Sequence, residues 1–193
     1  MSVLVLVGES ASGKTSLQNA LIKHNPDFKK IVTYTTRPKR KNEKNGVDYH
    51  FVSEAKFQKM VKKGYFIEHT KYRDWYYGTA KKDCINNDKS VVVLNPPGLR
   101  ALKRINSDIT SVYLYVDRRF RLINILLRKD NLNDEDLSID EAYRRNLSDV
   151  GQFNGIIDEV DYVIDNTEYH MNEEEVLKCL LSILKEAGED VDE

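Results

Sequence analysis

Cysteine is scarce in this chain of 193 residues, which contains only Cys84 and Cys179. Two such cysteines form neither a disulfide framework nor a metal-ligand pattern, so each is expected to be a small buried side chain in a reducing cytoplasm. The net charge of −1 gives no bulk case for binding nucleic acid or a membrane surface. No apolar run approaches the roughly 20 residues that span a bilayer, and no basic stretch precedes the apolar start, which argues against a signal peptide.

The remaining composition is that of an ordinary globular domain, with 32% charged and 40% hydrophobic residues. The unbroken apolar run at residues 3–7 predicts a strand buried on both faces, and a helix is expected at 15–24, ending before Pro26. Alternation of such strands with helices predicts an α/β fold with a parallel sheet flanked by helices. Further strands are expected at 31–35, 90–94, 112–116 and 162–164, and helices after Pro96-Pro97-Gly98 to 104, at 118–127, 139–152 and 173–187.

The segment Gly8-Glu-Ser-Ala-Ser-Gly-Lys-Thr15 lies between the first strand and the first helix. It matches G-x-x-x-x-G-K-[ST], the phosphate-binding loop, in the strand–loop–helix setting that the motif requires. Its glycines allow the backbone to fold tightly around an anion, and the loop N–H groups and the helix start then face phosphate oxygens. Lys14 is expected to contact the β- and γ-phosphates, and the Thr15 hydroxyl to ligate Mg²⁺. A nucleoside triphosphate site is therefore predicted at Gly8, Ser10, Ala11, Ser12, Gly13, Lys14, Thr15 and Ser16.

The pattern changes from about residue 36 to 87, where Lys, Tyr and His are frequent. Residues 49–52 and 65–68 alternate as strands do, and a helix is expected between them at 53–63, with Ser53 as its N-cap. These features predict a small mixed α+β insertion.

A second anion site is predicted in this insertion. Arg37 and Arg40 are separated by a turn that Pro38 stiffens, and two guanidinium groups can bind one phosphate bidentately. Tyr49 and Tyr77 could add phenolic donors to the same anion.

Glu68 follows the apolar residues 65–67, where a carboxylate can accept two N–H donors from the guanine edge. Thr79 offers a hydroxyl beside a flexible glycine. Adenine does not present the same pair of donors, so this pattern favours a guanine ligand.

Together these segments resemble guanylate kinase over nearly the whole chain. The shared motifs are the phosphate loop, T-T-R-x-x-R…E…G-x-D-Y-x-F, F-I-E, Y-Y-G-T, an arginine-bearing lid and a late D-x-V-I-x-N stretch ending at Asn166. The resemblance implies a P-loop NTPase-type core (1–34, 88–118 and 151–193), a GMP-binding insertion (35–87) and a helical lid (119–150). It also implies transfer of the γ-phosphoryl group of ATP to GMP or dGMP with Mg²⁺, by a monomer or homodimer.

The same resemblance assigns roles to matching residues. Arg37, Arg40, Tyr49 and Tyr77 match the positions around the GMP phosphate, and Thr33, Glu68 and Thr79 match the guanine contacts. Arg128 and Arg145 match the lid arginines, for which Arg118, Arg119, Arg121 and Arg144 compete, and Asn166 falls near the adenine-side contact. The expected catalytic residues are Lys14, Arg37, Arg128 and Arg145.

The chain departs from the family pattern at three positions. Glu9 replaces the usual proline of the loop, and Val93 and Asn95 replace the two acids of a D-x-D-x-x-G stretch. Asn95 can still accept a bond from the guanine amine or reach the substrate, whereas Val93 can neither hold a Mg²⁺-bound water nor orient an arginine.

Two other functions remain open on the sequence. One is a protein-binding domain of the guanylate-kinase-like type, although Lys14 and Thr15 are intact here. The other is a kinase of a different acceptor, either another nucleoside monophosphate or a ribose bisphosphate. A P-loop switch is disfavoured because the chain contains no guanine-selecting N/T-K-x-D motif.

Overall fold

The core of the protein is a parallel five-stranded sheet with the order β2-β7-β1-β8-β9. A computed structural model describes residues 3–39, 43–72, 74–85, 89–126, 143–144, 147, 149–167 and 172–191. The strands are β1 (Val3–Val7), β2 (Lys29–Lys30), β7 (Ser90–Leu94), β8 (Ile109–Tyr115) and β9 (Tyr162–Asp165). All four pairings within this sheet are parallel, which confirms the predicted α/β class.

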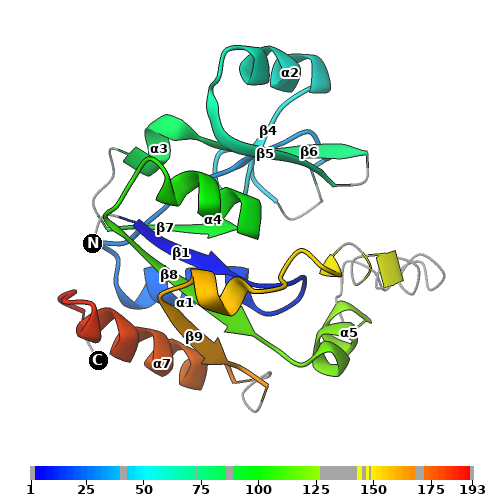
Figure 1. The fold of residues 1–193 in the computed structure, drawn as a ribbon. Helices are drawn as coiled ribbons and strands as arrows, with labels where there is room; N and C mark the ends of the chain where they lie inside the picture. Colours follow the sequence, from blue (N-terminus) through cyan, green and yellow to red (C-terminus); the bar gives the residue numbers. More distant parts are fainter. Residues whose placement is uncertain are drawn as a thin grey trace.

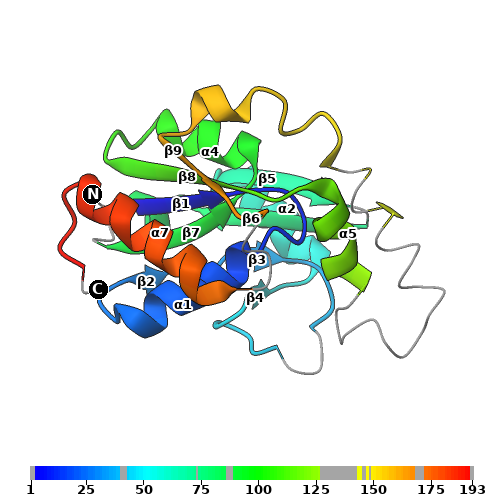
Figure 2. The same cartoon turned by 90° about the horizontal axis from the view of Figure 1, so that it is seen from below.

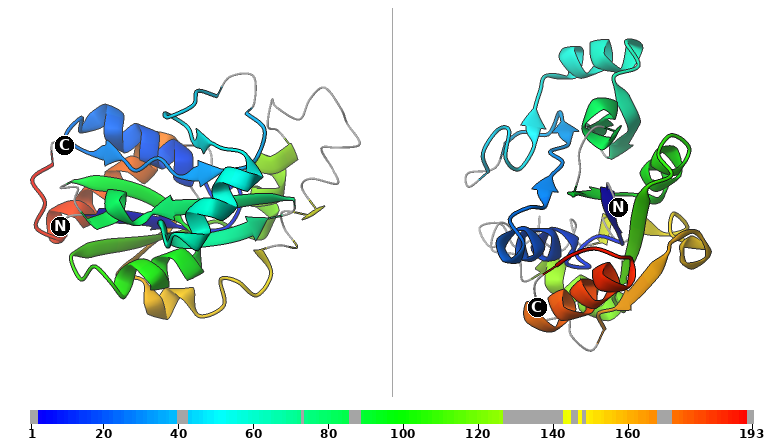
Figure 3. Two further views of the ribbon diagram at one scale, coloured as in Figure 1. Left: turned by 90° about the horizontal axis from the view of Figure 1, so that it is seen from above. Right: turned by 90° about the vertical axis from the view of Figure 1, so that its left-hand side faces the viewer.

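Helices cover both faces of this sheet, as the right-hand view of Figure 3 shows. On one face α1 (Lys14–His24) and α7 (Glu173–Glu186) lie side by side and share a core with Leu4 and Leu6 of β1. On the other face α4 (Pro96–Lys103) and the 3₁₀ helix η2 (Ile156–Glu159) pack on Val3, Val5 and Val7. Strand β1 is buried on both faces between these two cores, which explains why all five of its residues are apolar. Figure 2 shows the α1–α7 layer from below.

A second, smaller sheet stands apart from the core, at the top of Figure 1. Its order is β4-β3-β6-β5, formed by β3 (Tyr34–Thr35), β4 (His50–Phe51), β5 (Phe66–Tyr72) and β6 (Trp75–Ala80). Helix α2 (Glu54–Lys62) packs on it through Phe57, whose ring stacks on that of Phe66 at 4.6 Å. As predicted, Ser53 caps α2 by accepting a hydrogen bond from the Lys56 N–H. The short helix α3 (Lys81–Ile85) follows β6.

Two predicted elements differ in the structure. The single strand expected at 31–35 is wrong, because Lys29–Lys30 pairs with β7 in the core and Tyr34–Thr35 pairs in the smaller sheet. Residues 31–33 therefore carry the chain from one sheet to the other. Helix α4 begins at Pro96, because the prolines occupy its first turn and the Asn95 side chain accepts from the Gly98 N–H.

Helix α5 (Arg118–Leu126) follows β8, and its residues 119–126 fall within the predicted lid. Of the helix expected at 139–152, residues 143, 144, 147 and 149 are described as helical, whereas residues 150–155 form turns. No helix in the described part of the chain is long and apolar enough to cross a membrane.

Candidate active site

The phosphate loop leaves the sheet at the carboxyl end of β1. Val7 pairs with Leu94 of β7 and with Tyr113 of β8, so Gly8 and Asn95 follow adjacent strands at one edge of the sheet. Ligands of open parallel sheets bind at this edge. The strand pairing therefore brings the loop to the place where a nucleotide would bind.

The backbone of the loop requires its glycines. A Cβ atom at Gly8 would lie 2.6 Å from Ser12 Oγ and 2.7 Å from the Leu114 carbonyl oxygen, which real contacts do not allow. Gly13 has a φ of +94°, a value that residues with a Cβ rarely adopt. The loop is thus held in one tight conformation by contacts that a larger residue would break.

Lys14 folds back over this loop. Its Nζ donates to the Glu9 carbonyl oxygen at 2.6 Å and to Ser12 Oγ at 3.3 Å. Thr15 and Ser16 are exposed in the first turn of α1, which contains no acidic residue. The positive end of the helix dipole and the Lys14 charge therefore act together on an anion at this place.

A pocket of about 270 Å³ joins the loop to the smaller sheet. Gly8, Ser10 and Lys14 line one side, and Thr33, Tyr49, Glu68, Thr70, Lys71, Tyr77, Gly78 and Thr79 line the other. The remaining wall comes from Val93, Leu94 and Asn95 after β7 and from Asp149, Gln152 and Phe153. The structure therefore brings the predicted donor loop and most of the predicted acceptor residues to a single cavity.

Three of the residues predicted to surround an acceptor phosphate lie together. The buried Arg37 guanidinium lies 5.5 Å from the centre of the Tyr49 ring, and that ring lies 6.2 Å from the ring of Tyr77. Arg37 also donates to Glu43 at 2.6 Å and to the Pro38 carbonyl oxygen, which fixes its orientation. Tyr49 and Tyr77 thus line the pocket, and the Arg37 guanidinium lies beside the Tyr49 ring.

Glu68 brings a buried carboxylate to the pocket. Its Oε1 accepts a hydrogen bond from the Thr79 hydroxyl at 2.9 Å, whereas its Oε2 is buried without a partner. Burial raises the pKa of Glu68 to about 7, although the Thr79 hydrogen bond acts against this shift. A buried oxygen without a partner is costly unless a ligand supplies donors, so Glu68 is able to accept N–H groups of a ligand.

Asn95, predicted to contact the substrate, lines the pocket together with Val93, but the chemistry of this pair differs from that of two acids. The Asn95 Oδ1 already accepts the Gly98 N–H at 2.9 Å as the cap of α4. The oxygen expected to accept from guanine is therefore used within the protein. Gly98 is needed beside it, since a Cβ there would lie 2.9 Å from Glu68 Cγ.

The remaining predicted site residues do not line this pocket or lie outside the described residues. Asn166 lies behind the loop, with its Nδ2 3.8 Å from where a Gly13 Cβ would be, and its Oδ1 is buried without a partner. Arg40, Arg128 and Arg145 lie outside the described residues.

Asp149 is a pocket residue that the sequence patterns did not indicate. Its Oδ2 accepts a hydrogen bond from the Ser10 N–H of the phosphate loop at 2.8 Å, although 139 positions separate the two residues. Glu43, Thr70, Lys71 and Phe153 were missed as well. Asp149 lies in a polar segment without a recognisable motif, so no local signal could have identified it.

Mg²⁺ fits this site only as a partner of bound phosphates. Among the described residues, no group of three or more His, Cys, Asp or Glu side chains could hold a metal ion. The exposed Thr15 stands at the start of α1, beside the loop, where its hydroxyl can complete the shell of a nucleotide-bound ion that keeps several waters. The apolar Val93 provides no carboxylate at the end of β7.

Known proteins are similar to this chain in sequence and in architecture. The family profile described as "Guanylate kinase" matches residues 1–180. A guanylate kinase of Methylococcus capsulatus is 31% identical over 171 residues, which cover 86% of this chain and 81% of that protein. One from Rickettsia bellii is 27% identical over 172 residues, with 87% of each chain covered. The crystal structure of guanylate kinase from Anaplasma phagocytophilum matches with a TM-score of 0.67 at 25% identity, covering 96% of this chain and 85% of that one.

These matches, with a phosphate loop on a parallel sheet, define a P-loop nucleotide-binding protein of the α/β class. Within that class, the chain belongs to the guanylate kinase family.

The buried Glu68 carboxylate predicts a stability effect that depends on pH. Its pKa is about 7 in the folded protein, against an ordinary value of 4.5, so the folded state holds its proton more tightly. The free energy of unfolding therefore loses up to roughly 3 kcal/mol as pH rises from 4.5 through 7. Glu68→Gln removes this loss, so the variant should be more stable than the wild type at pH 8, with the difference shrinking toward pH 4.

Urea denaturation at pH 4, 6 and 8 measures this effect. Glu174→Gln is the matched control, because that side chain is 80% exposed and should give a difference nearly independent of pH. A Glu68→Gln variant no more stable than the wild type at pH 8 would show that the carboxylate is solvated.

Proposed function

We propose that this protein transfers the γ-phosphoryl group of ATP to GMP or dGMP, giving ADP and GDP or dGDP. The observation that carries the proposal is the buried, unpartnered Oε2 of Glu68 in the same cavity as Lys14 and the phosphate loop. Guanine offers the N1–H and the 2-amino group to such a carboxylate, whereas adenine presents an acceptor at N1. Membership of the family supports the same reaction.

On the donor side, the loop N–H groups, the start of α1 and Lys14 would hold the triphosphate of ATP. Lys14 would exchange its bond to the Glu9 carbonyl oxygen for phosphate oxygens. Bound Mg²⁺ would neutralise charge on the donor phosphates, with the Thr15 hydroxyl as its protein ligand. Asn166 would support the adenine side from behind Gly13.

On the acceptor side, Arg37, Tyr49 and Tyr77 would bind the phosphate of GMP, and Arg40 would join them. Thr33, Glu68 and Thr79 would bind the base, with Asn95 beside them in the pocket wall. Glu43 holds the Arg37 guanidinium in place, so that side chain loses little freedom when the acceptor binds.

The chemistry needs positioning more than covalent help. The acceptor phosphate oxygen is already ionised, so no general base is required, and catalysis comes from alignment and charge neutralisation. Lys14 would stabilise the migrating group, joined by Arg128 and Arg145 of the lid. Closure of the lid would exclude water and so prevent hydrolysis of ATP.

The surroundings support enzymatic turnover rather than a protein-binding role, because the phosphate loop retains Lys14 and Thr15 in a formed pocket. Use of a different acceptor is the alternative that Val93 and Asn95 favour, since both line the pocket without a charge. The two cysteines are free thiols, which supports a reducing cytoplasm as the place of action.

The role of Lys14 gives a direct prediction. Lys14→Ala should lower kcat by at least about 100-fold, because it removes a positive charge that acts on the migrating group. The Kd for GMP should stay within twofold of the wild type, since Lys14 does not contact the acceptor. A coupled assay of ADP release and calorimetric titration with GMP measure the two quantities.

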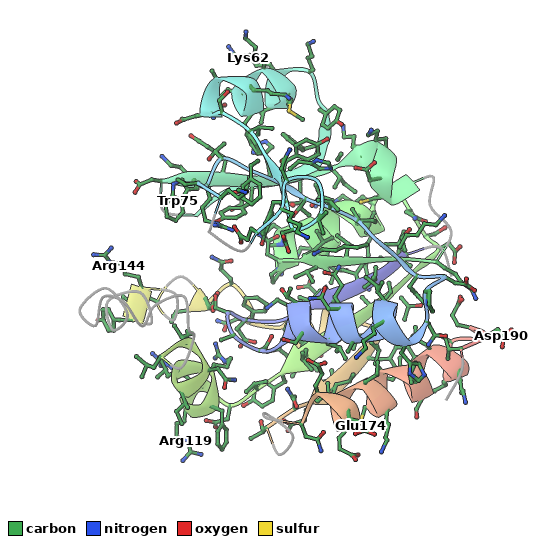
Figure 4. The ribbon with its side chains drawn as sticks, turned by 180° about the vertical axis from the view of Figure 1, so that it is seen from behind. Lys62, Trp75, Arg119, Arg144, Glu174 and Asp190 are labelled. Atoms are coloured by element: carbon green, nitrogen blue, oxygen red, sulfur yellow. The ribbon has the colours of Figure 1, made fainter. Side chains whose placement is uncertain are left out.

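Lys62→Ala, an exposed lysine at the end of α2 far from the loop, is the control and should behave as wild type (Figure 4). Turnover by Lys14→Ala at the wild-type rate would remove this lysine from the reaction.

Recognition of guanine by Glu68 predicts both a variant effect and a pH effect. Glu68→Gln should lower kcat/KM for GMP by about 100-fold, because a carboxylate accepts two charge-assisted bonds that an amide cannot reproduce. For the wild type, kcat/KM for GMP should fall about tenfold per pH unit below 7, where Glu68 becomes protonated. A panel of nucleoside monophosphates, assayed from pH 5.5 to 8.5, tests both.

The Glu68→Gln variant also controls for titration of the GMP phosphate, which affects both proteins alike. In this variant, kcat/KM for GMP should lack the steep fall below pH 7 that is due to Glu68. If kcat/KM for AMP equals that for GMP in the wild type, guanine selection by Glu68 is excluded and the alternative acceptor is favoured.

A further inference from the structure

A buried ion-pair cluster lies behind the donor side of the pocket. Arg121 of α5 is 9% exposed at its side chain, and its Nε donates to the Val116 carbonyl oxygen at 3.0 Å. Its Nη2 lies 3.5 Å from Glu9 Oε1 in the phosphate loop, and its Nη1 lies 3.8 Å from Asp149 Oδ2. The cluster therefore connects the phosphate loop with both ends of the predicted lid (119–150).

Glu9 is held in this cluster from two sides. The Tyr113 hydroxyl of β8 donates to Glu9 Oε2 at 2.9 Å, while Arg121 pairs with Oε1. Burial first, and the Glu9 charge second, raise the pKa of Tyr113, so its phenol remains a hydrogen-bond donor. The Glu9 carboxylate thus provides one negative charge for the buried Arg121 guanidinium, independently of Asp149.

Asp149 is a second carboxylate on the same guanidinium. Its Oδ2 also accepts the Ser10 N–H at 2.8 Å, and Asp149 and Ser10 line the pocket together with Lys14. One oxygen atom is thus bound by a phosphate-loop N–H and faces an arginine, which is the arrangement that a phosphate oxygen receives in an anion site. Asp149 occupies the place of an anionic ligand.

We propose that Ser10 N–H and Arg121 form part of the donor-phosphate site, and that Asp149 fills it as an internal anion until ATP displaces it. An oxygen of the triphosphate at the position of Asp149 Oδ2 would lie 2.8 Å from Ser10 N and 3.8 Å from Arg121 Nη1. This inference rests on the proposed use of ATP as donor.

The exchange keeps the buried charges balanced. When Asp149 leaves, Arg121 keeps Glu9 as a partner, so no unpaired guanidinium is left in the protein interior. If Asp149 stayed, its carboxylate would repel the triphosphate at hydrogen-bond distance from the loop. Since Asp149 lies at the end of the predicted lid (119–150), its release would also break a contact between that end and the phosphate loop.

Direct titration with ATP tests this exchange without any acceptor. Asp149→Asn keeps the shape of the side chain and removes its charge, so the Kd for ATP should fall at least fivefold by calorimetry. In the Asp149→Asn background, Arg121→Gln combined with Glu9→Gln removes a matched pair of charges and should raise the Kd at least tenfold. The Kd for GMP should change by less than twofold throughout.

Arg104→Gln is the matched control, because Arg104 is an exposed arginine at the end of α4, and it should leave the Kd for ATP unchanged. Thermal unfolding checks that each variant is folded. If Asp149→Asn binds ATP no more tightly than the wild type, the role of Asp149 as an internal anion is refuted. This test does not depend on the variant that carries Arg121→Gln and Glu9→Gln, so it holds even if that variant fails to fold. Failure of the wild type itself to bind ATP would refute the proposed function together with this inference.

Discussion

The parallel pairing of β1 with β7 and β8 is the constraint on which the site depends. It places the ends of three neighbouring strands at one edge, so that the phosphate loop, Asn95 and Tyr113 come close together. The smaller sheet then faces this edge through β5 and β6, and α4, which packs against β5, connects the two sheets. Two groups of residues predicted to bind phosphates, from segments far apart in the chain, thereby line one cavity.

The charges in this cavity are arranged to be completed by ligands. Glu68 keeps one carboxylate oxygen without a partner, and Lys14 donates to two oxygens of its own loop. Arg37 is the exception, because Glu43 already holds it. We expect the buried Glu68 carboxylate to lower the stability of the folded chain at neutral pH, because burial raises its pKa. Figure 4 shows Trp75, at the start of β6, and Arg144, in the segment after α5, on the same side of the molecule.

The sequence predicted best those features that are local. The phosphate loop is one contiguous segment whose chemistry requires its residues, and the buried strands at 3–7 and 90–94 follow from their apolar runs. The hydrogen bond between Glu68 and Thr79 could also be anticipated, because the family resemblance implies that both residues lie at the guanine site. The placing of Arg40, Arg128 and Arg145 stays a prediction.

Features that depend on distant partners could not be predicted in the same way. Residues 31–35 have the composition of one strand, but only Tyr34–Thr35 pairs, in the smaller sheet, while the core strand is formed by Lys29–Lys30. The contact between Asp149 and Ser10 joins positions 139 apart, and Glu9 was visible only as a departure from the family pattern. The contacts of the Glu9 side chain are made by Arg121 of α5 and Tyr113 of β8, which no pattern near position 9 indicates.

The central claim is that donor and acceptor sites face each other across one pocket, with Glu68 reading the acceptor base. A crystal structure with a bisubstrate ligand, in which adenosine and guanosine are joined through five phosphates, tests this claim most directly. The account predicts the guanine N1–H and 2-amino group on the Glu68 carboxylate and the polyphosphate along the loop to Lys14. Guanine bound away from Glu68, or a polyphosphate that bypasses the loop, would contradict it.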